Sequence, residues 1–210
     1  MLENIKCLGH STIKMLDKDK VIYIDPYNIK EDKKDADIIF ITHAHYDHFS
    51  EEDIIKIKNE NTIIVITEDI YNKVIELGFL EKKIIKVMPK EEYKIGNIRF
   101  QTIPAYNIDK KFHPKENMWV GYLININNIR YYIAGDTDIT NENKKVKCDV
   151  AFLPVGGTYT MDYKEAAELA NIIRPKIVVP IHYGIIVGTK EDALNFKNFI
   201  NKDIECEIRY

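Results

Sequence analysis

The most constraining feature of this sequence is a set of metal-ligand side chains placed directly after an apolar, β-branched segment. The segment Ala36–Thr42 is typical of a buried strand. Four ligand-type residues follow within the next six positions: His43, His45, Asp47 and His48. A rigid strand fixes the loop that follows it, so binding residues concentrate at such strand ends. Four such residues exceed what one tetrahedral ion easily takes from one short loop, which favours a pair of ions.

A surface loop that is rich in histidine by chance is the alternative explanation. It would suffice for one or two histidines, but not for this pattern after a buried strand. Imidazole and carboxylate groups suit Zn²⁺ or a similar first-row ion. We therefore expect two divalent metal ions as cofactors, with zinc preferred and manganese or iron as alternatives.

Composition narrows the class of protein. The 210 residues include 30 Lys and Arg against 33 Asp and Glu, a formal net charge of −3. Nucleic acid is therefore not expected as a partner, because phosphate binding calls for a surplus of basic residues. No repeat and no stretch rich in Pro, Gly or Ser interrupts the chain, so we predict one domain over residues 1–210.

The cysteines and the apolar segments indicate where in the cell the protein is expected. Cys7, Cys148 and Cys206 are scattered and odd in number, which indicates a reducing compartment rather than a disulfide framework. The longest apolar segment, Ile177–Val187, is too short to cross a bilayer, and the N-terminus lacks a secretory pattern. We expect a cytoplasmic protein without a membrane span. Nothing in the sequence indicates its oligomeric state.

Strand candidates outnumber helix candidates. The strands are expected at Val21–Asp25, Asp37–Thr42, Thr62–Thr67, Ile84–Met88, Tyr93–Ile103 with a turn at Gly96-Asn97, Trp119–Ile126, Ile129–Ala134, Val150–Val155, Ile177–Ile181 and Ile204–Ile208. The helices are expected at Glu51–Lys58, Glu68–Leu77, Asp162–Ile173 and Lys190–Ile200. Helices interleaved with strands in both halves predict a mixed α/β (α+β) fold of two sheets between helical layers.

Several motifs together resemble the metallo-β-lactamase superfamily. The spacing His-x-His-x-Asp-His after a hydrophobic strand is similar to its signature. Further landmarks follow in the expected order: Leu8-Gly9-His10-Ser11-Thr12, Ile24-Asp25-Pro26, Ala134-Gly135-Asp136-Thr137 and Pro180-Ile181-His182-Tyr183. They are most similar to uncharacterised metal-dependent hydrolases of the branch that includes lactonase-like hydrolases and the phospholipase D acting on N-acyl phosphatidylethanolamines. The resemblance implies a four-layer αββα sandwich of the metallo-β-lactamase type.

The resemblance also implies roles for individual residues. It assigns His43 and His45 to the first metal ion, and Asp47, His48 and His182 to the second. Asp136 would bridge the two ions, and Asp47 and Asp136 would be the catalytic carboxylates. Asp136 and His182 each follow an apolar strand. A turn-capping Asp and a hydrogen-bonded core His are the alternatives for these two residues.

Two residues near the N-terminus are expected close to the metals without a settled role. The resemblance suggests that Asp25 orients a ligand imidazole through its free N–H. His10 would act beside the metals or on the substrate side. The alternatives are that Asp25 is only a turn former before Pro26 and that His10 caps a strand.

One segment departs from the family pattern. Relatives carry a metal-binding histidine after a Pro-small dipeptide, and here Tyr106 follows Pro104-Ala105. A phenol with a pKa near 10 is a poor ligand at neutral pH. We predict that His113, seven residues downstream and before Pro114, supplies the missing imidazole. A solvent-facing or substrate-binding His113, with Tyr106 donating a hydrogen bond in the pocket, is the competing interpretation.

These expectations define the predicted activity. A metal-bridging hydroxide would attack an ester, a lactone or a phosphodiester in a small-molecule substrate. The cluster Lys110-Lys111…Lys115 would favour an anionic substrate unless it is a solvated loop. The alternatives are a non-haem di-iron redox protein, against which His45 argues because flavodiiron proteins resemble a pattern with Glu there, and a non-catalytic metal-binding domain.

Overall fold

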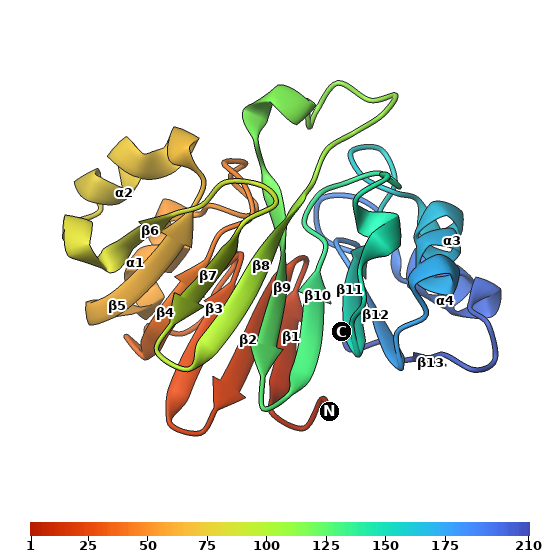
Figure 1. Cartoon of the computed structure of the whole chain (residues 1–210), viewed down its shortest axis with the longest axis horizontal. Helices are drawn as coiled ribbons and strands as arrows, with labels where there is room; N and C mark the ends of the chain where they lie inside the picture. Colours follow the sequence, from red (N-terminus) through yellow and green to blue (C-terminus); the bar gives the residue numbers. More distant parts are fainter. The chain divides into compact units, whose positions relative to one another are not determined.

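The computed structural model describes residues 1–210 and contains two compact units, Leu2–Met88 and Pro89–Tyr210, the second together with Met1. Each unit is built on one β-sheet (Figure 1). The predicted mixed α/β fold with two sheets and few helices is confirmed. The prediction of one domain over residues 1–210 is not tested by this division and stays a prediction.

The sheet of the unit Leu2–Met88 has six strands in the order of the chain. They are β1 Ile5–Gly9, β2 Thr12–Asp17, β3 Lys20–Ile24, β4 Ala36–Phe40, β5 Lys58–Ile66 and β6 Ile84–Lys86. The first three strands pair in antiparallel fashion, and β3 to β6 pair in parallel. Strands β1, β3 and β4 therefore run in one direction, and the residues that follow them emerge at one edge of the sheet.

The helices of this unit are short. Helix α1, Glu51–Ile57, begins after Ser50, whose Oγ accepts a hydrogen bond from the Asp53 backbone N–H. It buries Ile54 and Ile57 against the apolar face of the sheet, each contributing on the order of 1.5–3 kcal/mol. Helix α2 covers Tyr71–Glu76 after a 3₁₀ turn at Glu68–Ile70.

The sheet of the unit Pro89–Tyr210 has seven strands in the order β13-β12-β11-β10-β9-β8-β7. They are β7 Glu92–Ile95, β8 Ile98–Pro104, β9 Val120–Ile126, β10 Ile129–Ile133, β11 Val150–Pro154, β12 Ile177–Ile181 and β13 Glu205–Cys206. Strands β7 to β10 are antiparallel neighbours, and β10 to β13 are parallel. The ends of β8, β10, β11 and β12 therefore also share one edge.

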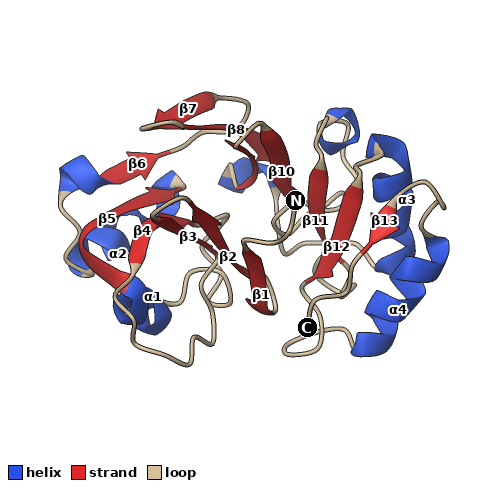
Figure 2. Ribbon diagram, turned by 90° about the horizontal axis from the view of Figure 1, so that it is seen from below, coloured by secondary structure: helices blue, strands red, loops and turns tan.

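Two helices cover one side of this second sheet (Figure 2). Helix α3, Tyr163–Ile173, starts with a capping box between Asp162 and Glu165. Helix α4, Lys190–Phe199, packs against it and contributes the fully buried Phe196. None of the helices has the length and apolar character that a membrane crossing requires.

Most predicted elements are present, with differences that have local causes. The hairpin of β9 and β10 turns at Asn127 and Asn128, both with positive φ, as expected. The predicted helix Glu68–Leu77 is divided into a 3₁₀ turn and a short α-helix, and the predicted strand Ile204–Ile208 pairs only at Glu205–Cys206. The strands β1 and β2 were indicated only by the family resemblance, although Ile5-Lys6-Cys7 and Ile13-Lys14-Met15 do alternate apolar with polar residues.

Candidate metal-binding residues

Asp25 organises the first group of candidate residues. It follows β3 with a φ of 45° and is fully buried. The backbone N–H of Thr42 donates to its Oδ1 at 2.8 Å, and the Thr42 hydroxyl donates to its Oδ2 at 2.7 Å. His48 Nδ1 lies 2.8 Å from Asp25 Oδ2. The carboxylate thus ties the end of β3 to the histidine-rich loop after β4.

This contact also sets the tautomer of the His48 ring. A carboxylate only accepts hydrogen bonds, so His48 Nδ1 carries the proton and Nε2 presents its lone pair. His48 Nε2 lies 3.6 Å from Asp47 Oδ2. A lone pair and a carboxylate oxygen repel each other unless a proton or a metal cation lies between them.

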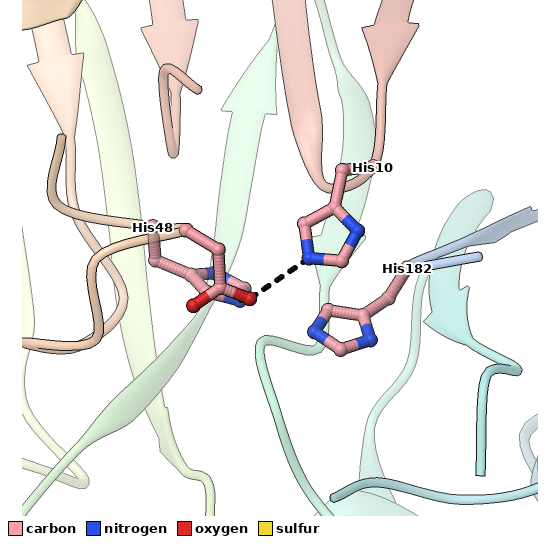
Figure 3. A group of neighbouring side chains, drawn as sticks. His10, His48 and His182 are labelled. Carbon is pink, nitrogen blue, oxygen red and sulfur yellow. Dashed lines mark hydrogen bonds and ion pairs between the residues drawn. The ribbon is translucent and has the colours of Figure 1, made fainter. Parts of the chain in front are cut away.

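His10 holds the other side of Asp47. It follows β1 with a φ of 52°, and its Nε2 lies 2.9 Å from Asp47 Oδ2 (Figure 3, dashed line). Both residues are buried. One potential ligand atom each from His10, Asp47 and His48 lies within 4.8 Å of the other two. His10 is therefore a candidate ligand as well as a residue that orients Asp47.

His43 and His45 form a second pair in the same loop. His43 Nε2 lies 3.1 Å from His45 Nδ1, and the Thr42 hydroxyl lies 3.0 Å from His43 Nδ1. The His43 ring also packs on the His48 ring with centroids 4.0 Å apart. The unit Leu2–Met88 therefore gathers the four residues of the sequence motif at one edge of its sheet.

Asp136 is the centre of the candidate residues in the unit Pro89–Tyr210. It follows β10 and is 3% exposed. His113 Nε2 lies 3.3 Å from Asp136 Oδ2, and His182 Nε2 lies 3.1 Å from the same oxygen. Asp136 therefore groups three ligand-type side chains in this unit.

His113 is buried at 1% exposure, which excludes the solvent-facing alternative. Its Nδ1 lies 3.2 Å from Asn107 Oδ1, and its backbone N–H donates to the same oxygen at 3.0 Å. An amide oxygen only accepts, so His113 Nδ1 carries the proton and Nε2 turns its lone pair towards Asp136.

His182 takes its position from a tight strand end. It follows β12 with a φ of 58° (Figure 3), a conformation that is uncommon for residues other than glycine. A Cβ atom on Gly156 would lie 2.3 Å from the His182 carbonyl oxygen and 2.7 Å from Val187 Cγ2. Gly156 is thus the residue that lets the backbone of His182 approach the segment after β11.

Tyr106 does not take the place of an imidazole. Its side chain is 8% exposed, and its hydroxyl donates to Glu142 Oε2 at 2.8 Å. Lys90 and Lys115 pair with Glu142 Oε1 at 3.1 and 3.6 Å. Burial works to raise the pKa of Glu142, but the hydrogen bonds from Tyr106 and Lys90 and the charge of Lys115 lower it to about 2.

The chemistry of these groups fits divalent metal ions. The side chains are buried imidazoles and carboxylates, and two imidazoles are held so that an Nε2 lone pair faces a carboxylate oxygen. Nitrogen and oxygen donors of this kind suit zinc and neighbouring first-row ions. Positioning of each ligand by a second group is typical of metal sites.

Two residues that support the site carried no assigned role in the sequence interpretation. Thr42 ends the apolar run before the motif, and Asn107 follows the Pro-Ala-Tyr segment that departs from the family pattern. A polar residue directly after a strand that leads to ligands was the only available signal. Their hydrogen-bond partners, Asp25 and His113, are distant in sequence or separated by a loop.

Comparisons with known proteins identify the family. The family model described as "Beta-lactamase superfamily domain" matches residues 4–182. A UPF0173 metal-dependent hydrolase of Pyrococcus abyssi is 30% identical over 211 residues, covering 93% of this chain and 91% of that protein. The crystal structure of a protein from Parabacteroides distasonis matches with a TM-score of 0.81 and 31% identity, covering 98% of this chain and 91% of that one.

A second solved structure matches in fold. Igni18, described as a metallo hydrolase from Ignicoccus hospitalis, gives a TM-score of 0.80 at 24% identity, covering 97% of this chain and 93% of that one. The predicted metallo-β-lactamase fold class and the resemblance drawn from the motifs are both confirmed. The chain belongs to the β-lactamase superfamily, in the UPF0173 family of metal-dependent hydrolases.

Proposed function

We propose that this protein hydrolyses a small ester or lactone with the help of two divalent metal ions. The observation that carries the proposal is the buried Asp136 carboxylate, which contacts the Nε2 atoms of both His113 and His182. A carboxylate with an imidazole on either side is suited to join two ions. Zinc is the metal that these groups favour, with manganese and iron as alternatives.

The proposal draws ligands from both units of the chain. The first ion would be held by His43, His45 and His113, and the second by Asp47, His48 and His182. Asp136 would be shared between them. This division follows the family resemblance. The side-chain contacts within each unit support the groupings of His43 with His45, of Asp47 with His48, and of Asp136 with His113 and His182.

Metal ions of this type lower the pKa of a bound water and neutralise negative charge as it develops on the substrate. The residues of the chain would prepare that chemistry. Asp25 and Thr42 fix the tautomer of His48, so that Nε2 stays available. His10 holds the Asp47 carboxylate in place, where its second oxygen can align a water or accept a proton.

Water is the nucleophile that the chain's own residues support. Burial raises the pKa of the Cys148 thiol to about 12 and that of the Cys206 thiol to about 11. Both thiols are therefore protonated at neutral pH, whereas nucleophilic attack by cysteine requires the thiolate. No serine lies in a nucleophile-elbow motif.

The three scattered cysteines also support the proposal that the protein works in the cytoplasm.

The charges near His113 favour an uncharged substrate over a phosphodiester. Lys110 pairs with Asp138, and Lys115 pairs with Glu142. Two of the three lysines expected to attract an anion are therefore neutralised within the protein. In the same loop Ile108 and Phe112 are exposed at 55% and 46%. An apolar acyl or aryl group suits such a surface better than a phosphate does.

Metal analysis combined with a substrate panel tests this proposal. Purified protein loaded with zinc or manganese should contain about two ions per chain and hydrolyse esters or lactones faster than phosphodiesters. Asp136→Asn keeps the size of the side chain and should lower kcat/KM by about 10²–10³. Asp149→Asn is the matched control, because Asp149 pairs with Lys176 away from the candidate residues and should keep normal activity. Full activity in Asp136→Asn, or one ion per chain at saturation, would overturn the proposal.

A further inference from the structure

We infer that Asn107 is the positioning residue that delivers His113 to the metal site. This inference rests on the proposed function. It explains how an imidazole seven residues downstream replaces the one that the family pattern expects at Tyr106. Asn107 and His113 are both buried, at 7% and 1% exposure, although they bound a loop that is otherwise largely exposed.

Three hydrogen bonds between the two residues close this loop. The backbone N–H of Asn107 donates to the His113 carbonyl at 2.8 Å. The backbone N–H of His113 returns a bond to Asn107 Oδ1 at 3.0 Å, and His113 Nδ1 reaches the same oxygen at 3.2 Å. The backbone and the ring of His113 are therefore both oriented by one side chain.

The opposite end of the Asn107 amide fixes which way that side chain is turned. Its Nδ2 lies 2.9 Å from the Tyr159 carbonyl oxygen and 3.2 Å from Asp138 Oδ1. Both partners are acceptors, so the NH₂ group must face them and the oxygen must face His113. The orientation of the amide then sets the tautomer of the imidazole, with Nε2 as the atom available to a metal.

Asp138 connects this loop to the segment that carries Asp136. Asp138 Oδ2 accepts a hydrogen bond from the Ile108 backbone N–H at 2.8 Å, and its own backbone N–H donates to the Tyr106 carbonyl at 3.0 Å. Because Asp136 lies two residues earlier, the same short segment supplies the carboxylate and anchors the loop. His113 and Asp136 are thereby held in register at 3.3 Å.

The test measures metal affinity and the state of the His113 ring in the intact protein. In Asn107→Ala, binding of one of the two zinc ions should weaken by about 10- to 100-fold, while the other ion binds as in the wild type. In the zinc-loaded protein, ¹⁵N NMR should show His113 protonated at Nδ1, and this signal should shift or exchange rapidly in Asn107→Ala. A role confined to loop stability would leave the ring signal unchanged.

Two further variants keep the test decisive. Asn107→Asp keeps an acceptor for His113 but turns a second acceptor towards the Tyr159 carbonyl oxygen, so it should recover more of the zinc affinity and of the ring signal than Asn107→Ala, but not all of either. Asn171→Ala is the matched control, because Asn171 also bonds two backbone groups in the same unit, Phe199 and Asn201, but lies outside this loop.

The outcomes separate the inference from the proposed function. Wild-type affinity in Asn107→Ala, or an equal loss in Asn171→Ala, would overturn the role of Asn107 and leave the hydrolase proposal intact. Failure of the wild-type protein to bind two ions would overturn the proposed function itself. Circular dichroism and the thermal midpoint would show whether each variant remains folded.

Discussion

Three of the candidate residues have backbones in the left-handed region, which is uncommon for residues other than glycine. His10, Asp25 and His182 have φ values of 52°, 45° and 58°, and each directly follows a strand. This conformation costs about 1–2 kcal/mol for an L-residue. It reverses the chain within one residue and so turns the side chain away from the strand direction. The strain is located where ligand geometry requires it.

A pair of substitutions at His182 measures this strain. His182→Ala and His182→Gly remove the same imidazole, but only glycine relieves the positive φ. After allowing for the larger entropy of glycine in the unfolded chain, we expect metal-free His182→Gly to be about 0.5–1 kcal/mol more stable than His182→Ala. Urea unfolding with chelator present gives the comparison.

The buried His113 provides the control, because its φ is not positive. There the order should reverse, with His113→Ala more stable than His113→Gly by about 0.5–1 kcal/mol. The same order of stability at both positions would mean that His182 carries no backbone strain.

The Glu142 carboxylate gives a prediction about pH. Its pKa is lowered to about 2 from an ordinary value of 4.5, so the stabilisation is fully present above pH 4.5 and is lost as pH falls towards 2. The difference is worth at most about 3 kcal/mol. The advantage of the metal-free wild type over Glu142→Gln in free energy of unfolding should therefore shrink between pH 5 and pH 2. A constant difference over that range would contradict the assigned interaction.

The candidate site is built from residues at strand ends. Some of these strands could be predicted from the sequence alone, and others could not. The strand before His43 and the strand before Asp136 were predicted because each ends in an apolar run, Ile38–Phe40 and Tyr131–Ile133. The residues that follow them were expected at the site because binding residues concentrate at strand ends and because the motifs resemble the family pattern. The strand ending at Gly9 was expected only from the family resemblance, because its alternation of apolar and polar residues covers no more than Ile5–Cys7.

The supporting contacts could not be predicted, because they depend on distances across the fold. Asn107 and Glu142 are ordinary polar residues in the sequence, and nothing local indicates that one holds His113 and the other accepts from Tyr106. The role of Gly156 could not be predicted either, because its Gly-Gly-Thr sequence indicates only a turn. Its close approach to His182 arises only when β11 and β12 pair.

The close approach of Gly156 to His182 leads to a testable prediction about this strand end. In Gly156→Ala, the new methyl group would lie 2.3 Å from the His182 carbonyl oxygen, so the end of β12 must shift. We expect a loss of about 1–3 kcal/mol in stability and a weaker affinity for zinc, measured by urea unfolding and metal titration. Gly157→Ala is the neighbouring control, because its Cβ would meet nothing closer than 3.7 Å. It should lower stability through its φ of 66° but leave zinc affinity unchanged.

At the scale of the whole molecule, the candidate ligands are divided between two compact units. His10, His43, His45, Asp47 and His48 belong to Leu2–Met88, and His113, Asp136 and His182 belong to Pro89–Tyr210. Neither set alone offers the ligands that the proposed pair of ions requires. If the ions are shared, metal binding must stabilise both units together, because a ligand that binds only the folded state adds its binding free energy to that state.

Removal of metal should therefore weaken the protection of backbone amides against hydrogen exchange in both units at once. At zinc concentrations about 100 times the dissociation constant, each ion contributes about 2.7 kcal/mol, which chelation would remove. Hydrogen exchange should show this as faster exchange of the amides of β4 in one unit and β12 in the other. In His48→Ala, which alters only the unit Leu2–Met88, zinc should also protect the β12 amides less than in the wild type. If zinc still protected β12 fully in that variant, the two units would bind their ions independently, and the shared pair would be wrong.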